Sequence, residues 1–172
     1  MSDAQKIVPS LWFDRETEEA VDFYISIFNG APHAAGDSKV ISIKRYEKGM
    51  EVPGAEELEG KVLTAIFELD GQRFMALDGG PIFKFTEAVS FYVECEDQAE
   101  VDYFWDKLSA VPEAEQCGWL KDKFGLSWQI VPRQMGELLN SPMKQKALAA
   151  MNAMLQMKKL VIADLQKAFD EA

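Results

Sequence analysis

An internal duplication constrains this chain more than any other feature of its sequence. The stretch from Ala88 to Leu108 aligns without a gap on the stretch from Val8 to Phe28, at a constant separation of 80 residues (88 minus 8). Chance similarity of two amphipathic helices is the alternative, but a matching strand before each helix and a matching proline after it favour a repeated strand–helix unit. The helical core positions are Ala20, Phe23, Tyr24 and Ile27 in the first copy and Val101, Phe104, Trp105 and Leu108 in the second.

The first repeat has the pattern of a strand, a helix and three further strands. Its helix is expected to end at Asn29-Gly30, a usual exit from a helix. Asp70-Gly71 is the strongest two-residue signal for a β-hairpin, and the acidic residues 47–60, rich in Gly and Pro, indicate a loop. The expected elements are strand 7–13, helix 18–28 and strands 39–46, 62–69 and 72–77.

The second repeat follows the same order with shorter connections, and the second of its strands is the hardest to place. Beyond Pro132 the pattern becomes helical. We therefore predict an α+β fold in which domain 1–132 contains two βαβββ repeats and residues 133–172 form a helical tail on the domain or on a dimer partner. The repeats span about 6–78 and 88–131. The expected elements of the second repeat are strand 89–95, helix 98–109 and strands 116–121 and 126–131. The expected elements of the tail are helices 134–139 and 143–157 and a last short helix with Leu165 and Phe169.

Composition excludes several classes of function. The net charge of −11 repels phosphate backbones, which disfavours nucleic-acid binding. No apolar run approaches the length of a membrane span, and the first ten residues have no signal-peptide core, so we expect a cytoplasmic protein with no membrane partner. Two cysteines make no disulfide framework, and Cys95, at the end of an apolar strand, is expected to be a buried free thiol.

Five segments of the chain form an ordered set of motifs: VPSLWFD, EEAVDFY, LDGQRFMALDGGPIFKFTEAVSFYVEC, EVDYFWDKLSA and EQCGWLKDKFGLSWQIVP. These segments resemble the vicinal oxygen chelate superfamily of glyoxalases, bleomycin-resistance proteins and extradiol dioxygenases. The resemblance is to its PhnB-like branch, which carries the name 3-demethylubiquinone-9 3-methyltransferase, and it covers residues 6–132. It implies paired, curled mixed sheets that form a cleft. No Gly-rich loop of the kind that binds a nucleotide-type methyl donor follows a strand here.

The resemblance also implies a divalent metal held by His and Glu, and this chain departs from that pattern. The metal histidines would fall at positions 8–9 and 88–90, which contain no His, and the glutamate position is Gln129. Only Asp78 offers a carboxylate near the remaining ligand position. The one histidine, His33, is expected in an exposed loop. Since a transition metal needs several N, O or S donors, we predict no metal and no cofactor, and we assign no catalytic residue.

Alternation along the strands predicts which side chains line the cleft. The purely apolar face of each first strand should meet the helices, and the other face should line the cleft. The predicted cleft residues are Ser10, Trp12, Asp78, Ser90, Tyr92, Ser127 and Gln129. The alternative is that Trp12 and Tyr92 simply fill this space as core.

A cleft with aromatic walls and few polar groups is typical of a small-molecule pocket. We therefore predict metal-free binding of a small apolar or aromatic molecule. One alternative is an enzyme of the same fold, of lyase, isomerase, dioxygenase or methyltransferase type, that acts on a small metabolite. The other is a scaffold or interaction protein that uses the Met-rich tail. We also predict a homodimer, because the tail has more apolar surface than a lone surface helix needs; these residues are Met143, Met151, Met154, Leu155 and Met157.

Overall fold

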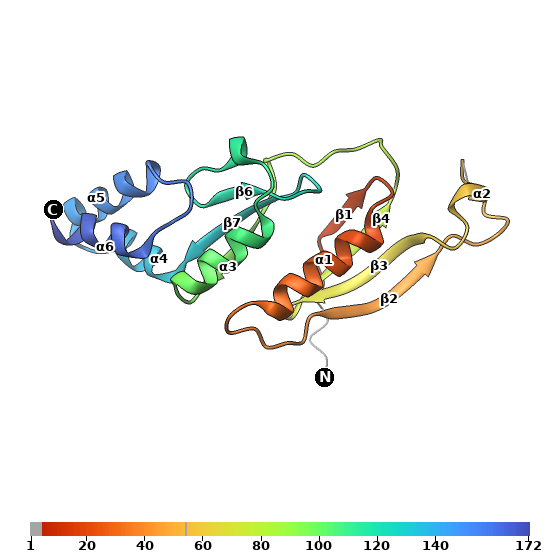
Figure 1. Ribbon diagram of the computed structural model, residues 1–172, viewed down its shortest axis with the longest axis horizontal. Helices are drawn as coiled ribbons and strands as arrows, with labels where there is room; N and C mark the ends of the chain where they lie inside the picture. Colours follow the sequence, from red (N-terminus) through yellow and green to blue (C-terminus); the bar gives the residue numbers. More distant parts are fainter. Residues whose placement is uncertain (1–4, 54) are drawn as a thin grey trace. The chain divides into compact units, whose positions relative to one another are not determined.

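The computed structural model describes residues 5–53 and 55–172 of the chain (Figure 1). The first four residues of the predicted domain, and residue 54 of the predicted acidic loop, lie outside the described residues. The chain divides into two compact units. Unit 1 comprises the residues up to Gly30 together with Ala34–Lys84, and unit 2 comprises Ala31–His33 together with Phe85–Ala172.

Unit 1 is a four-stranded mixed sheet with one long helix on one face (Figure 1). The strand order is β1-β4-β3-β2, in which β1 and β4 are parallel and the other neighbours are antiparallel. This is the βαβββ order expected for a repeat. The elements are β1 Ser10–Phe13, α1 Thr17–Gly30, β2 Lys39–Arg45, α2 Ala55–Leu58, β3 Val62–Leu69 and β4 Gln72–Asp78.

The packing of unit 1 follows from the alternation of side chains between the two faces of the sheet. On β1, Leu11 and Phe13 are buried, whereas Ser10 is exposed and Trp12 half-buried. Helix α1 packs against the apolar face, with Ala20, Tyr24 and Ile27 among its buried residues. Asp70 and Gly71 both have positive φ, as a type I′ turn requires, and the predicted hairpin is confirmed. The predicted acidic loop contains the short helix α2, whose Leu58 is buried.

Unit 2 contains the second repeat, and its sheet has three strands in the order β5-β7-β6. Strands β5 and β7 are parallel, and β6 and β7 are antiparallel. Asp97 caps α3 by accepting a hydrogen bond from the backbone N–H of Glu100. The elements are β5 Ser90–Cys95, α3 Gln98–Leu108, the 3-10 helix η1 Pro112–Ala114, β6 Trp119–Lys121 and β7 Ser127–Pro132.

The described part of unit 2 has no counterpart of β2. The chain between α3 and β6 is short and forms η1 instead of a strand. Ala110 N–H donates to the carbonyl of Lys121, so this connection covers part of the free edge of β6. The fold class predicted from the sequence, two related mixed sheets with C-terminal helices, is confirmed, and the missing strand is the one that was hardest to place.

The C-terminal helices have a small core of their own within unit 2. Leu138, Ala150, Leu165 and Phe169 form a buried cluster, with Met154 and Met157 packed against it. The segment between the last two helices is held to the rest of unit 2 by the Gln98 amide, which donates to Leu160 O and accepts from Ile162 N–H. The three helices are α4 Arg133–Leu139, α5 Lys144–Leu155 and α6 Ile162–Asp170.

Candidate functional site

The open face of the unit 1 sheet, opposite α1, carries the two predicted β1 residues. Ser10 pairs in register with Met75, and Trp12 pairs with Leu77. Because these side chains alternate with the buried Leu11 and Phe13, they lie on the face that α1 does not cover. The structure therefore confirms the faces predicted for β1.

Trp12 is held in one position by its neighbours in unit 1. Its Nε1–H donates to the carbonyl oxygen of Gly80 at 2.8 Å. The edge of its ring contacts Phe83, with ring centroids 4.8 Å apart at 74°. A Cβ atom on Gly79 would lie 2.1 Å from the indole, so only glycine allows the chain to pass this closely. The result is a fixed and half-buried aromatic surface.

Asp78 does not share the open face with Trp12. It pairs in register with Phe13 and is buried, and its Oδ1 accepts the backbone N–H of Arg15 at 3.2 Å. Burial is the main reason why the pKa of this carboxyl is raised above its ordinary value. The placement of Asp78 in the cleft is therefore corrected: at the end of β4 it faces the α1 side of the sheet.

Unit 2 brings together the other four predicted residues on one face of its sheet. The parallel register aligns Ser90 with Ser127 and Tyr92 with Gln129. Gln129 Nε2 donates to Ser90 Oγ at 2.9 Å, which joins the two strands across this face. Ser127 is buried, and the Tyr92 side chain is largely exposed.

Strand β6 adds two side chains that the sequence did not assign to this face. Trp119 pairs in register with Gln129, and Lys121 pairs with Ser127. Lys121 forms an ion pair with Glu87, which neutralises its charge. The signal that could have found both residues is the antiparallel pairing of β6 with β7, once the turn at 122–125 had fixed its register.

The predicted residues thus form two sets, one on each sheet. Ser10 and Trp12 belong to unit 1, and Ser90, Tyr92, Ser127 and Gln129 belong to unit 2. That Trp12, Tyr92 and Gln129 line a single cavity stays a prediction.

The residues present do not fit the metal site that the superfamily implies. Ser90 and Gln129, at two of the expected ligand positions, carry a neutral hydroxyl and a neutral amide that bond to each other. Among residues 5–53 and 55–172, no group of three or more His, Cys, Asp or Glu side chains could hold a metal ion. Such a donor set is unsuited to a transition metal.

His33 and Cys95, two side chains of the types that often serve as base or nucleophile, are a paired imidazole and a buried thiol. His33 Nε2 lies 3.0 Å from Asp97 Oδ2 in a half-exposed pair, and this hydrogen bond raises the pKa of His33. Cys95 is a fully buried free thiol, as predicted, and burial raises its pKa to about 12. A thiol with so high a pKa carries almost no reactive thiolate at neutral pH.

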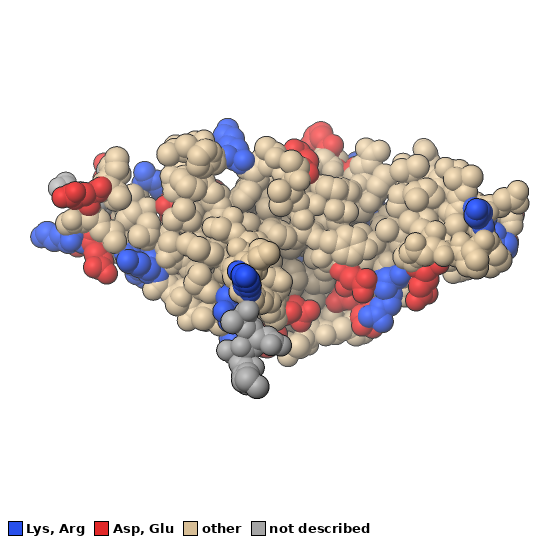
Figure 2. Space-filling view, turned by 180° about the vertical axis from the view of Figure 1, so that it is seen from behind, with Lys and Arg blue, Asp and Glu red and all other residues tan. Residues whose placement is uncertain are grey.

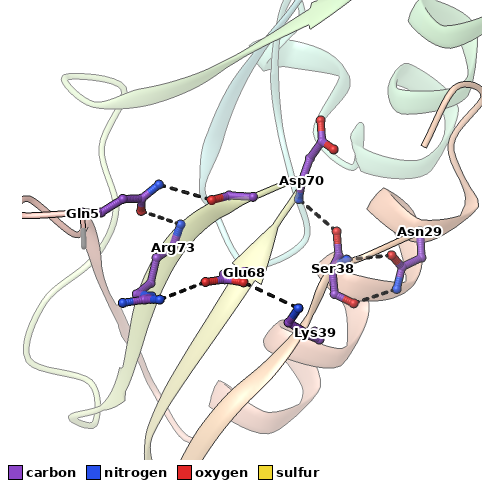
Figure 3. Close-up of polar contacts among 8 residues, drawn as sticks. Gln5, Asn29, Ser38, Lys39, Glu68, Asp70 and Arg73 are labelled. Atoms are coloured by element: carbon purple, nitrogen blue, oxygen red, sulfur yellow. Dashed lines mark hydrogen bonds and ion pairs between the residues drawn. The ribbon is translucent and has the colours of Figure 1, made fainter. Parts of the chain in front are cut away.

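A second polar cluster lies at the hairpin end of unit 1 (Figure 3). Glu68 lies between Arg73 and Lys39, at 3.1 Å and 3.9 Å. The Gln5 amide donates to Gly71 O and accepts from Arg73 N–H. These groups hold the strand ends together, so we assign them a structural role.

The fold and the family match define the class of the protein. Two related units, each with a strand, a helix and a mixed sheet, make this a protein of the vicinal oxygen chelate superfamily. More narrowly, the chain belongs to the family described as 3-demethylubiquinone-9 3-methyltransferase, whose model matches residues 5–131. The PhnB-like branch expected from the sequence is thereby confirmed.

Solved structures agree with this assignment. A PhnB protein from Bacillus cereus is 38% identical, with a TM-score of 0.59 over 74% of this chain and 99% of that one. A protein from Pseudomonas aeruginosa shares the fold at 19% identity, with a TM-score of 0.56 over 75% of this chain and 98% of that one. No curated protein matches the chain.

Proposed function

We propose that this chain binds a small apolar or aromatic molecule on the open faces of its sheets, without a metal. The observation that carries this proposal is the fixed, half-buried indole of Trp12. An aromatic ring already held in place loses little conformational entropy when a ligand stacks on it. The unit 2 face, considered by itself, carries neutral hydroxyl and amide groups, which are the kind of polar anchors found in small-molecule sites.

Catalysis has less support than binding. The enzyme alternatives need a nucleophile and base, a metal or a methyl-donor site. In the described part of the chain, the only histidine is paired with Asp97 and Cys95 is buried with a high pKa. The methyl transfer in the family's name therefore remains an alternative without a site assigned to it.

The acidic net charge supports a small-molecule partner over nucleic acid. On the face drawn in Figure 2, Lys and Arg residues are scattered among acidic and uncharged ones, and no broad basic patch is visible there. In the described ranges, no helix is both long and apolar enough to cross a bilayer.

The binding proposal is tested with ethylbenzene as an apolar aromatic probe. Titration followed by amide NMR should show saturable shifts around Trp12, and Trp12→Ala should weaken binding roughly tenfold because the stacking surface is lost. Gly79→Ala should weaken it similarly, because the added Cβ forces the indole to move. Tyr103→Ala, which removes a half-buried aromatic ring on α3, is the matched control. Binding that is equal in all four proteins would contradict the proposal.

A metal-free protein is a separate prediction. After dialysis against buffer without chelator, elemental analysis should find well below one Zn, Ni, Mn or Fe per chain. Added Zn²⁺ should leave the Tm unchanged, since binding to the native state alone would raise it. About one metal ion per chain, retained through dialysis, would refute this prediction.

A further inference from the structure

Ser127 has a buried hydroxyl group that the fold itself does not satisfy. The residue is 1% exposed, and its Oγ has no hydrogen-bond partner in the described structure. A hydroxyl removed from water without a partner costs free energy, so such groups are rare in native proteins and each requires an explanation. A ligand atom that accepts the Ser127 proton would provide one.

The neighbours of Ser127 on the same face are also hydrogen-bond donors. In register, Ser90 lies directly opposite Ser127 on β5, and Gln129 follows two positions along β7. Because Ser90 Oγ accepts from Gln129 Nε2, the Ser90 proton points away from that bond. The amide retains its second N–H. Three side chains with donor groups thus lie within one short stretch of the sheet, and the hydroxyl of Ser127 is the buried one.

The charges near this cluster disfavour an anion. Lys121, the cation on this face, forms an ion pair with Glu87. Glu94 lies two positions beyond Tyr92 on β5 and therefore on the same face. A carboxylate or phosphate placed here would meet these carboxylates without an unpaired cation to balance it.

We propose that Ser127, Ser90 and Gln129 form a hydrogen-bonding site for an uncharged carbonyl oxygen of the ligand. A carbonyl oxygen accepts two hydrogen bonds and brings no charge, which matches neutral donors beside a paired lysine. The exposed ring of Tyr92 supplies an adjacent apolar wall. This inference rests on the proposed function and narrows its ligand class to neutral aromatic carbonyl compounds.

The test compares three probes of similar size: acetophenone, ethylbenzene and benzoate. Acetophenone should bind about fivefold more tightly than ethylbenzene, the effect of one net hydrogen bond, and benzoate should bind most weakly. Ser127→Ala should lower the affinity for acetophenone more than the affinity for ethylbenzene, and so remove most of the preference for acetophenone. Ser26→Ala, the same change at an exposed serine on α1, should leave the preference intact.

A stability measurement separates this role from a purely structural one. Ser127→Ala removes an unpaired buried hydroxyl, so its Tm should equal or exceed that of the parent. A marked drop in Tm together with an intact acetophenone preference would overturn the inference. Equal binding of acetophenone and ethylbenzene, or tightest binding of benzoate, would also overturn it while leaving the proposed function standing. Binding of none of the three probes would overturn both.

Discussion

Replacing Asp122 by alanine is expected to lower the free energy of unfolding by roughly 3–5 kcal/mol. The carboxylate is buried at the turn between β6 and β7. Its Oδ1 accepts the backbone N–H groups of Phe124 and Leu126 at 2.9 Å and 3.0 Å, and its Oδ2 accepts Trp128 Nε1–H at 2.8 Å. Alanine would leave three donors without this acceptor, two of them in a buried environment.

Urea denaturation monitored by tryptophan fluorescence measures this loss. Asp122→Asn should give an intermediate value, because an amide keeps one acceptor oxygen for the turn but cannot accept at both positions. Asp106→Ala, at an exposed position of α3, is the matched control and should change stability by less than about 0.5 kcal/mol. A loss below about 1 kcal/mol for Asp122→Ala would show that these hydrogen bonds do not determine the hairpin's stability.

This turn also bears on the candidate site. Trp128, anchored by Asp122, occupies the core face of β7, and its neighbours Ser127 and Gln129 face the other way. The anchor therefore holds β7 in register with β6, and β7 carries the Gln129 side chain that donates to Ser90. A weakened turn should reduce ligand binding as well as stability.

The sequence was sufficient where local rules decide the structure. Asp70-Gly71 specifies its hairpin because both residues tolerate positive φ. The faces of β1 follow from strict alternation, and the matching positions of β5 follow from the duplication. These two patterns placed Ser10 and Trp12 on one face, and Ser90, Tyr92, Ser127 and Gln129 on another.

The sequence alone was insufficient where tertiary contacts determine the position of a side chain or the presence of a strand. Asp78 stands at the end of β4, where the register with Phe13 and the Arg15 N–H set its direction, and neither is visible in a pattern. The second repeat lacks the counterpart of β2, since a chain this short between α3 and β6 forms a turn more easily than a paired strand. The contacts that hold Trp12 in place come from Gly79 and Gly80, which lie 67 and 68 residues further along the chain (79 minus 12, 80 minus 12). No local pattern around Trp12 reveals them.

In helix α5 of the tail, the sequence pattern predicts the burial of some side chains and fails for others. Helical spacing alone predicts that Ala147, Met151, Met154 and Leu155 share one stripe of α5. In the structure Met154 packs on the small helical core, whereas Met151 and Leu155 are exposed. The boundary between the two faces depends on how α5 meets α4 and α6, which no single-helix pattern contains.

The exposed side of α5 underlies the second large prediction, a homodimer of about twice the 19.4 kDa chain mass. Leu148, Met151 and Leu155 are 36–60% exposed and recur at helical spacing, so they form one apolar stripe. We propose that the stripes of two copies pack together about a two-fold axis, the commonest symmetry of oligomers. Antiparallel packing would bring Lys144 and Lys146 near the C-terminal end of the partner's α5, where the helix dipole favours cations.

Light scattering at micromolar concentration should therefore give a mass near that of two chains. Met151→Asp places a charge in the centre of the stripe and should shift the mass toward the monomer without unfolding the protein, because the side chain is already exposed. Ala163→Asp adds the same charge at an exposed position of α6 and should leave the dimer intact. A parent protein with the mass of one chain would refute the dimer. A dimer equally stable in both variants would place its interface elsewhere, because a charge buried without a partner at the centre of an apolar contact cannot be accommodated at small cost.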